Sequence, residues 1–258
     1  MVTYPNCKIN LGLHVVGKRP DGYHDLETVF LPVHELRDRL EIVADSQLPA
    51  AVVEQTGLVL DNDPEDNICL RAWQLMHDGY GVPAVRIRLD KGIPFGAGLG
   101  GGSSDAAFTL KMLNGMFAIG LDEAALERLA ARIGADCAFF IKNRPAFATG
   151  IGDILEPMAI DLDAYRIAVE IPEGEHVSTR EAYGGLRHDL RGTARPDLRE
   201  VVGKPVEEWC NLIVNDFEAS VFPAHPAIAE LKNDMYRRGA VYASMTGSGA
   251  AVFGIFKK

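Results

Sequence analysis

The chain has 258 residues, of which 47% are hydrophobic and 24% charged, and its formal net charge is −10 at pH 7. This hydrophobic share excludes a disordered or collagen-like protein, and the acidic balance disfavours binding to a nucleic-acid backbone. No apolar run approaches the roughly 20 residues of a membrane-spanning helix, and the N-terminal segment lacks the pattern of a signal peptide. We therefore expect a cytoplasmic globular protein whose partner is neither nucleic acid nor membrane.

In the first 157 residues, short β-type segments alternate with helical segments. We predict strands at 7–15, 39–43, 84–89 and 146–149, and helices at 67–80, 103–117 and 122–133. The last of these helices begins with acidic residues and carries apolar residues at helical spacing, which is typical of an amphipathic helix.

Beyond residue 157 we predict a strand at 165–171 and helices at 178–186, 206–222 and 227–238. Two further strands are expected within 240–256, around a Thr-Gly-Ser-Gly turn. Glycines and a proline between residues 150 and 162 indicate a linker. These elements predict an α+β fold with two domains, at residues 1–156 and 157–258.

The cysteines, at positions 7, 69, 137 and 210, form no CxxC pair, and the seven histidines show no HExxH spacing. Scattered thiols in a cytoplasmic chain are expected to stay reduced. We expect neither a disulfide nor a metal ion that protein side chains hold by themselves.

The most informative segment is Pro-Phe-Gly-Ala-Gly-Leu-Gly-Gly-Gly-Ser-Ser-Asp-Ala-Ala, at residues 94–107. Glycine allows positive φ angles, and its N–H group can approach a ligand without interference from a Cβ atom. Consecutive N–H groups at a helix start carry partial positive charge, and serine hydroxyls can donate to phosphate oxygens. The segment therefore predicts a cradle for a polyphosphate. We expect it to be formed by Pro94, Phe95, Gly96, Ala97, Gly98, Leu99, Gly100, Gly101, Gly102, Ser103 and Ser104.

Three other interpretations compete for this segment. It contains the GxGxxG pattern of dinucleotide-binding folds. That pattern requires a strand after the helix, but the next predicted element is a second helix at 122–133. A Walker A loop requires Gly-Lys followed by Ser or Thr, which the chain lacks. A flexible turn without a ligand is disfavoured because its glycines cost conformational entropy for little packing. The second glycine segment, at 246–249, is compatible with a hairpin turn or with a ligand loop.

The glycine segment resembles the phosphate-binding motif of the GHMP kinases, the superfamily of galactokinase, homoserine kinase and mevalonate kinase. Two segments before it narrow the resemblance, and two segments after it stand in the order expected of the superfamily. They are Lys8-Ile9-Asn10-Leu11, Arg19-Pro20-Asp21-Gly22-Tyr23-His24, Ile133-Gly134-Ala135-Asp136 and Thr246-Gly247-Ser248-Gly249. The first two motifs resemble the branch that phosphorylates 4-diphosphocytidyl-2-C-methyl-D-erythritol in non-mevalonate isoprenoid biosynthesis.

This resemblance implies a two-domain kinase fold with the active site in the cleft between the domains, ATP as phosphoryl donor and a small cytidine diphosphate derivative as acceptor. The alternative within the superfamily is a kinase of the homoserine or mevalonate type, against which Tyr23 and His24 argue because those substrates carry no base. A nucleotide sensor without activity is a further alternative, and it would need neither Lys8 nor Asp136.

In these kinases the residues that match Lys8 and Asp136 are the catalytic pair. Asp136 would be a general base, or an electrostatic partner that orients the hydroxyl, and Lys8 would favour the developing alkoxide. Without the resemblance, Lys8 is equally compatible with an outward-facing lysine on an edge strand, and Asp136 with an acid at a helix terminus.

The resemblance also places Asn67 near the adenine and Lys91 near the nucleotide. Mg²⁺ is expected to accompany ATP, held mostly by phosphate and water, with a hydroxyl of Ser103 or Ser104 as a further ligand. By themselves, Asn67 is compatible with a helix N-cap and Lys91 with a solvated lysine.

On the acceptor side, the resemblance assigns Tyr23 and His24 to the cytosine end, and an aromatic ring can stack on a pyrimidine. We expect both residues to project from a loop. Asn10 is expected near the moiety that is phosphorylated, and Thr179 and Tyr183, four residues apart on a helix, near the cytosine. A packed hairpin turn for Tyr23 and a core position for Tyr183 are the alternatives.

Overall fold

The computed structural model describes residues 1–58, 67–186 and 195–258. The chain forms two compact units, and each of them is discontinuous in sequence. The first unit consists of Met1–Cys7, His34–Phe95 and Gly100–Asn143, and the second of Lys8–Val33, Gly96–Leu99 and Arg144–Lys258. The predicted domains at 1–156 and 157–258 stay a prediction.

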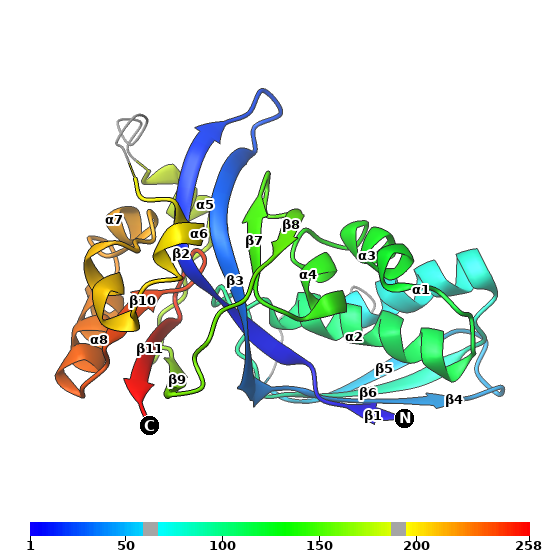
Figure 1. Cartoon of the computed structure of the whole chain (residues 1–258). Coiled ribbons are helices and arrows are strands. Elements are labelled where there is room, and N and C mark those ends of the chain that lie inside the picture. The colour runs from blue at the N-terminus through cyan, green and yellow to red at the C-terminus, as the bar shows by residue number, and fades with distance from the viewer. Residues whose placement is uncertain (59–66, 187–194) are drawn as a thin grey trace. The chain divides into compact units, whose positions relative to one another are not determined.

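A four-stranded sheet forms one layer of the first unit, in the order β1-β4-β6-β5 (Figure 1). Its strands are β1 (Val2–Thr3), β4 (Arg39–Ala44), β5 (Val52–Gly57) and β6 (Val85–Lys91). β4 runs antiparallel to β1 and β6, whereas β5 runs parallel to β6. In β6 every second side chain, from Val85 onward, is buried, as expected of a strand with one face toward the core. Strands β1 and β5 were not predicted.

Four helices lie on one side of this sheet, two of them next to it and two beyond (Figure 1). They are α1 (Ile68–Tyr80), α2 (Gly101–Met116), α3 (Glu123–Ala131) and α4 (Cys137–Lys142). The first three lie within about two residues of the predicted helices because their ends carry local signals. Asn67 and Asp122 cap α1 and α3 by accepting a hydrogen bond from a backbone N–H of the first turn, a preferred role of these residues. α4 was not among the predicted helices.

The second unit contains two sheets. One has the order β10-β11-β9, with β9 (Tyr165–Glu170), β10 (Tyr242–Met245) and β11 (Val252–Lys257) all antiparallel. The other has the order β2-β3-β7-β8. Its strands are β2 (Asn6–Lys18), β3 (His24–Arg37), β7 (Ala146–Thr149) and β8 (Ile154–Pro157).

The predicted linker at 150–162 is wrong in its first half, because it contains β8. Strands β7 and β8 pair antiparallel, with Thr149 opposite Ile154. Gly150 and Gly152 have φ angles of +66° and +96°, so these glycines serve a tight turn rather than a flexible connection.

The predicted helix at 206–222 is also wrong, because it is interrupted. It consists of a 3₁₀ helix, η3 (Val206–Asn211), and a short helix, α7 (Glu218–Val221). Between them the backbone runs beside β2: the N–H of Leu13 donates to the carbonyl of Val214, and the N–H of Asp216 donates to the carbonyl of Leu13. Backbone groups that bond to a strand are not available for a helix.

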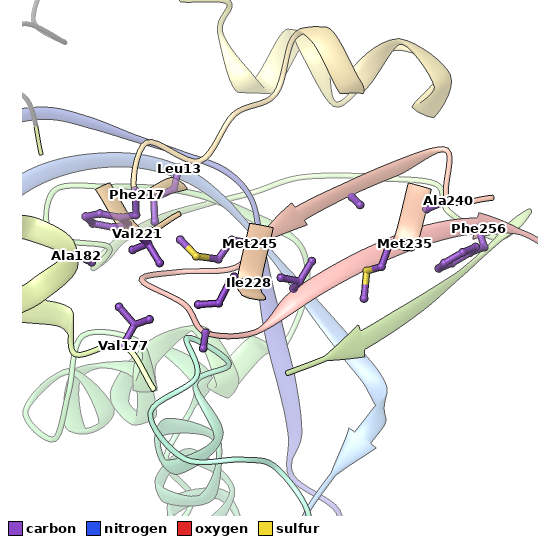
Figure 2. Packing of buried hydrophobic residues seen from close by; sticks show 13 residues of the cluster. Leu13, Val177, Ala182, Phe217, Val221, Ile228, Met235, Ala240, Met245 and Phe256 are labelled. Carbon is purple, nitrogen blue, oxygen red and sulfur yellow. The ribbon is translucent and has the colours of Figure 1, made fainter. Parts of the chain in front are cut away.

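The remaining helices of the second unit are α5 (Thr179–Gly184), α6 (Leu198–Val201) and α8 (Pro226–Arg237). A buried hydrophobic cluster joins α8 to β10 and β11, with Met235 and Met245 among its members (Figure 2). Burial of one large apolar side chain contributes about 1.5–3 kcal/mol, so this cluster anchors the end of β10. Within the described ranges, no helix is both long and apolar enough to cross a membrane.

Candidate active site

The glycine-rich segment adopts the backbone conformation that glycine permits. Gly96, Gly98 and Gly100 have φ angles of +67°, +77° and +69°. Gly100 occupies the N-cap position of α2, and the helix begins at Gly101, two residues before the predicted start. The first N–H groups of a helix have no partner within the helix and attract anions.

The first turn of α2 fits a polyphosphate. A Cβ atom at Gly101 would lie 2.8 Å from Cγ2 of Ile93, so the backbone passes where a larger residue would overlap with the core. Ser104 is fully buried, and its hydroxyl has no hydrogen-bond partner in the described part of the chain. A buried hydroxyl without a partner is costly, which is consistent with a ligand at this turn.

The second glycine segment connects β10 to β11 and therefore forms a hairpin turn. It also packs against the first glycine segment within the second unit. A Cβ atom at Gly98 would overlap with the carbonyl oxygen of Thr246, and the N–H of Ala251 donates to the carbonyl of Ala97 over 3.2 Å. The backbone of one loop thus supports the backbone of the other.

Lys8 lies on β2 and is 4% exposed, so it is not a solvent-facing edge lysine. Its ammonium group donates to Oδ1 of Asn10 over 2.7 Å and lies 4.8 Å from the ring centre of Phe30. Asn10 is itself 2% exposed, and its amide nitrogen donates to the hydroxyl of Thr28 over 2.9 Å. Lys8 is therefore held by a buried polar network.

Asp136 is half-buried and stands at the N-cap position of α4, where its side chain makes no capping hydrogen bond. The next residue, Cys137, hydrogen-bonds through its thiol to Ser103, and burial raises the pKa of this thiol to about 11. The start of α4 is thereby tied to the first turn of α2. The pairing of Lys8 with Asp136 stays a prediction.

An aromatic stack lies at the start of β3. The rings of His24 and Tyr183 stack with their centroids 4.6 Å apart, and Phe217 meets Tyr183 edge-on at 4.8 Å. His24 is the first residue of a strand rather than part of a loop, whereas Tyr23 lies in the preceding turn and is 62% exposed. The structure thus brings two predicted acceptor-site residues, His24 and Tyr183, into contact.

Thr179, another predicted acceptor-site residue, is exposed at the start of α5. Its hydroxyl lies 3.4 Å from the hydroxyl of Ser248. Helix α5 therefore connects the aromatic stack to the second glycine segment.

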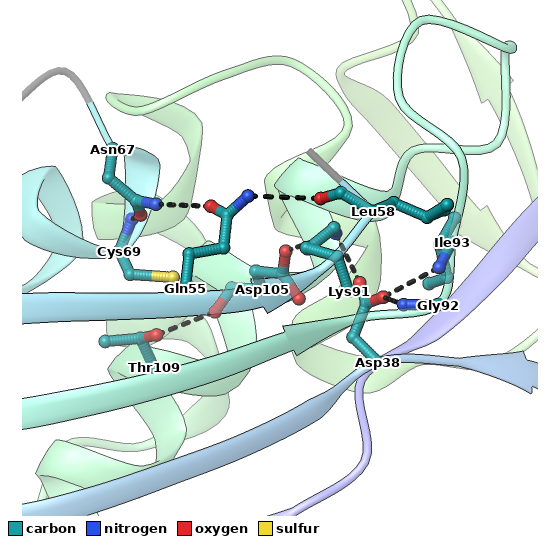
Figure 3. Close-up of polar contacts among 10 residues, drawn as sticks. All are labelled: Asp38, Gln55, Leu58, Asn67, Cys69, Lys91, Gly92, Ile93, Asp105 and Thr109. Atoms are coloured by element: carbon teal, nitrogen blue, oxygen red, sulfur yellow. Dashed lines mark hydrogen bonds and ion pairs between the residues drawn. The ribbon is translucent and has the colours of Figure 1, made fainter. Parts of the chain in front are cut away.

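Lys91 is almost wholly buried, so the interpretation as a solvated lysine is wrong. Its ammonium group pairs with Asp38 and lies 2.7 Å from Oδ2 of Asp105, in the second turn of α2 (Figure 3). Oδ1 of Asp38 accepts the N–H groups of Gly92 and Ile93. The network joins the strand that precedes the glycine segment to the helix that follows it.

The charges of this network are strongly coupled. Burial by itself would lower the pKa of Lys91, but the carboxylates of Asp105 and Asp38 raise it above the usual value. Burial raises the pKa of Asp105 well above its usual range, although the neighbouring ammonium acts in the opposite direction. One cation faces two carboxyl groups, so a proton on Asp105 leaves the network neutral.

Asn67 is bound within the protein. Its side-chain oxygen accepts the N–H of Cys69 over 2.9 Å, which caps α1, and its amide nitrogen donates to Gln55 over 3.3 Å (Figure 3). Gln55 in turn donates to the carbonyl of Leu58. The helix N-cap interpretation is therefore correct, and a contact with adenine stays a prediction.

Comparisons with known proteins decide the family. The model "GHMP kinases N terminal domain" matches residues 67–144, and "GHMP kinases C terminal" matches residues 194–258. A 4-diphosphocytidyl-2-C-methyl-D-erythritol kinase of Bacteroides fragilis is 49% identical over 259 residues, which cover 99% of this chain and 92% of the relative. The chain belongs to the 4-diphosphocytidyl-2-C-methyl-D-erythritol kinase family.

Solved structures agree with this membership. The crystal structure of 4-(cytidine 5'-diphospho)-2C-methyl-D-erythritol kinase superimposes with a TM-score of 0.80 at 34% identity, covering 99% of this chain and 90% of that chain. Mevalonate kinase of Methanococcus jannaschii reaches 0.73 at 15% identity, covering 100% of this chain and 90% of that chain, and shares the fold alone. The predicted α+β fold of the GHMP type is thus confirmed, and this family member is an ATP-dependent small-molecule kinase.

Sequence reasoning missed several residues that contact the predicted site residues. Asp38 and Asp105 were not recognised as partners of Lys91, although the alternation of β6 points its side chain toward the core. Phe217 was also missed, and no local pattern indicates it. Thr246 belongs to the Thr-Gly-Ser-Gly motif, but its hydroxyl was not singled out. Among the described residues, no three His, Cys, Asp or Glu side chains lie together where they could hold a metal ion.

Proposed function

We propose that the chain transfers the γ-phosphoryl group of ATP to a hydroxyl of 4-diphosphocytidyl-2-C-methyl-D-erythritol, a step of non-mevalonate isoprenoid biosynthesis. The observation that carries the proposal is the identity of 49% with a relative of that name, over nearly the whole chain. Relatives of the mevalonate type reach only 15%, so the alternative within the superfamily is not favoured.

In this proposal the glycine segment and the first turn of α2 hold the phosphates of ATP through backbone N–H groups and the hydroxyls of Ser103 and Ser104. Phosphoryl transfer is catalysed mainly by positioning and charge stabilisation. Lys8 stabilises negative charge that develops at the acceptor oxygen, and Asp136 takes up or orients the proton of the hydroxyl.

The acceptor is proposed to place its cytosine against Tyr23 and His24, with Tyr183 and Thr179 on the same side and Asn10 near the reacting hydroxyl. The stacked pair of His24 and Tyr183 supports this assignment. Asn67 and Lys91, whose side chains are bound within the protein, are proposed to shape the wall of the nucleotide site. Mg²⁺ with ATP, and a cytoplasmic location, stay predictions from the sequence.

The decisive test is an acceptor panel. The purified protein is incubated with ATP, Mg²⁺ and equimolar 4-diphosphocytidyl-2-C-methyl-D-erythritol, mevalonate and homoserine, and mass spectrometry shows which compound gains a phosphoryl group. We expect the cytidine compound alone to react. Phosphorylation of mevalonate or homoserine at a comparable rate would contradict the proposal.

The role of Asp136 has its own test. Asp136→Ala should lower kcat by about 10²–10⁴-fold, the range of a general base, while ATP still binds in a calorimetric titration. The matched control is Asp78→Ala, at an exposed position on α1, which should leave kcat unchanged. A kcat of Asp136→Ala within twofold of the parent would exclude the proposed role.

A further inference from the structure

The hydroxyl of Thr246 is bonded twice to Asn10. Thr246 is fully buried, and its Oγ1 accepts the backbone N–H of Asn10 over 2.9 Å and donates to Oδ1 of the same residue over 3.3 Å. That Oδ1 atom also accepts the ammonium group of Lys8 over 2.7 Å. Thr246 and Lys8 therefore share one acceptor atom.

The backbone on both sides of Thr246 is held by hydrogen bonds from one side chain. The amide nitrogen of Asn215 donates to the carbonyls of Met245 and Gly247, at 2.9 Å each. Oδ1 of Asn215 accepts the N–H of Phe217 over 3.0 Å, which fixes the orientation of this amide. The hydroxyl of Thr246 is thus presented to Asn10 from a rigid support.

The orientation of Asn10 is fixed as well. The hydroxyl of Thr28 donates to the carbonyl of Gly12 over 2.5 Å, so its oxygen must accept from the amide nitrogen of Asn10. This leaves Oδ1 of Asn10 toward Lys8 and Thr246. A rotated amide would present its NH₂ group to an ammonium group, and two donors repel each other.

We propose that Thr246 is a positioning residue for phosphoryl transfer: through the amide of Asn10, it sets the place of the Lys8 ammonium group. The inference rests on the proposed function, because it takes Lys8 as the group that stabilises charge at the acceptor oxygen. On this inference the second glycine segment contributes to the reaction, in addition to packing against the first glycine segment. A displacement of about 1 Å at a catalytic group can lower the rate about 10²-fold.

The test compares Thr246→Val, which removes the hydroxyl at nearly constant volume, with Thr246→Ser, which keeps it. Thr246→Val should lower kcat about 10- to 100-fold, with the KM of ATP within about threefold of the parent, and Thr246→Ser should stay within about threefold in kcat. Thr109→Val is the matched control, since Thr109 is fully buried on α2 and its hydroxyl donates to the carbonyl of Asp105.

A purely structural role of the hydroxyl predicts that Thr246→Val and Thr109→Val lose stability alike and keep kcat per folded molecule. A kcat of Thr246→Val within twofold of the parent would therefore overturn the inference, as would a Thr246→Ser variant that is equally impaired. If Thr246→Val does not fold, Thr246→Cys replaces the hydroxyl with a weakly bonding thiol. The inference then requires at least a fivefold loss of kcat at unchanged KM of ATP.

The activity of Lys8→Met shows whether a negative result contradicts the proposed function or only the inference about Thr246. If Lys8→Met keeps its activity, the assigned role of Lys8 is wrong and the inference about Thr246 falls with it. If Lys8→Met is inactive and Thr246→Val is normal, the inference alone is wrong.

Discussion

The ammonium group of Lys91 lies 2.7 Å from Oδ2 of Asp105, and both side chains are almost completely shielded from solvent. The same ammonium pairs with Asp38, whose other oxygen accepts two backbone N–H groups just before the glycine segment. The charge network thus fixes both ends of the segment proposed to hold ATP. Loss of this network should lower the free energy of unfolding.

Lys91→Met removes the cation and leaves two buried carboxyl groups without it. Breaking a buried pair in this way costs about 3–5 kcal/mol, and urea unfolding at pH 7 measures it. Arg88→Met is the matched control, because Arg88 pairs with Glu54 on the exposed side of the sheet and an exposed pair contributes at most ~1 kcal/mol. Equal losses in the two variants would contradict the assigned burial.

Asp105 gives the network a pH dependence of defined sign. In the folded protein its carboxyl keeps a proton at pH values where the unfolded chain, with a pKa of about 3.9, has lost it. Its contribution to stability therefore falls as the pH rises from the unfolded toward the folded pKa, by up to ~1.4 kcal/mol per pH unit.

The amide of Asp105→Asn does not titrate in this range, whereas the parent loses stability as the pH rises. The variant should therefore become more stable relative to the parent between pH 5 and pH 8. Urea unfolding at pH 5, 6.5 and 8 gives the difference. A difference that stays constant across this range would show that Asp105 is ionised throughout.

Two adjacent glycines of α2 should respond differently to alanine. At Gly101 the new Cβ atom would lie 2.8 Å from Cγ2 of Ile93, whereas at Gly102 the nearest atom is Cγ2 of Ile68 at 3.9 Å. We expect Gly101→Ala to lose about 1–3 kcal/mol through overpacking, and Gly102→Ala to keep its stability or gain about 0.4–1 kcal/mol. Thermal and urea unfolding measure both, and equal stability of the two variants would contradict the packing at Gly101.

Tyr23 tests the proposed cytosine contact. Stacking of a base on an aromatic ring is worth about 1–3 kcal/mol, so Tyr23→Ala should raise the KM of the cytidine substrate at least about fivefold. The KM of ATP should change less than about twofold. Tyr80→Ala, at an exposed tyrosine that ends α1, is the control and should change neither constant. Equal losses for both substrates would rule out the stacking role of Tyr23.

The sequence predicted helices well where their ends carry capping residues, as at Asn67 and Asp122, because a cap acts within one turn of the chain. It failed at 206–222, where a contact with β2 outweighs the helical pattern. Lys91 could have been placed in the core, since Val85, Ile87 and Leu89 precede it on the inward face of β6. The predicted strand ended at residue 89, so this signal was not used.

By itself, the sequence determined the family, the fold class and the glycine segment, because these follow from short motifs and local backbone conformations. Only the tertiary structure decided which polar groups meet in the interior. Asn10 and Thr246 are 236 residues apart in sequence, and Asp38 and Lys91 are 53 apart. Buried polar groups need hydrogen-bond partners, and folding supplies these from any part of the chain. A local sequence pattern does not indicate which distant residue becomes the partner.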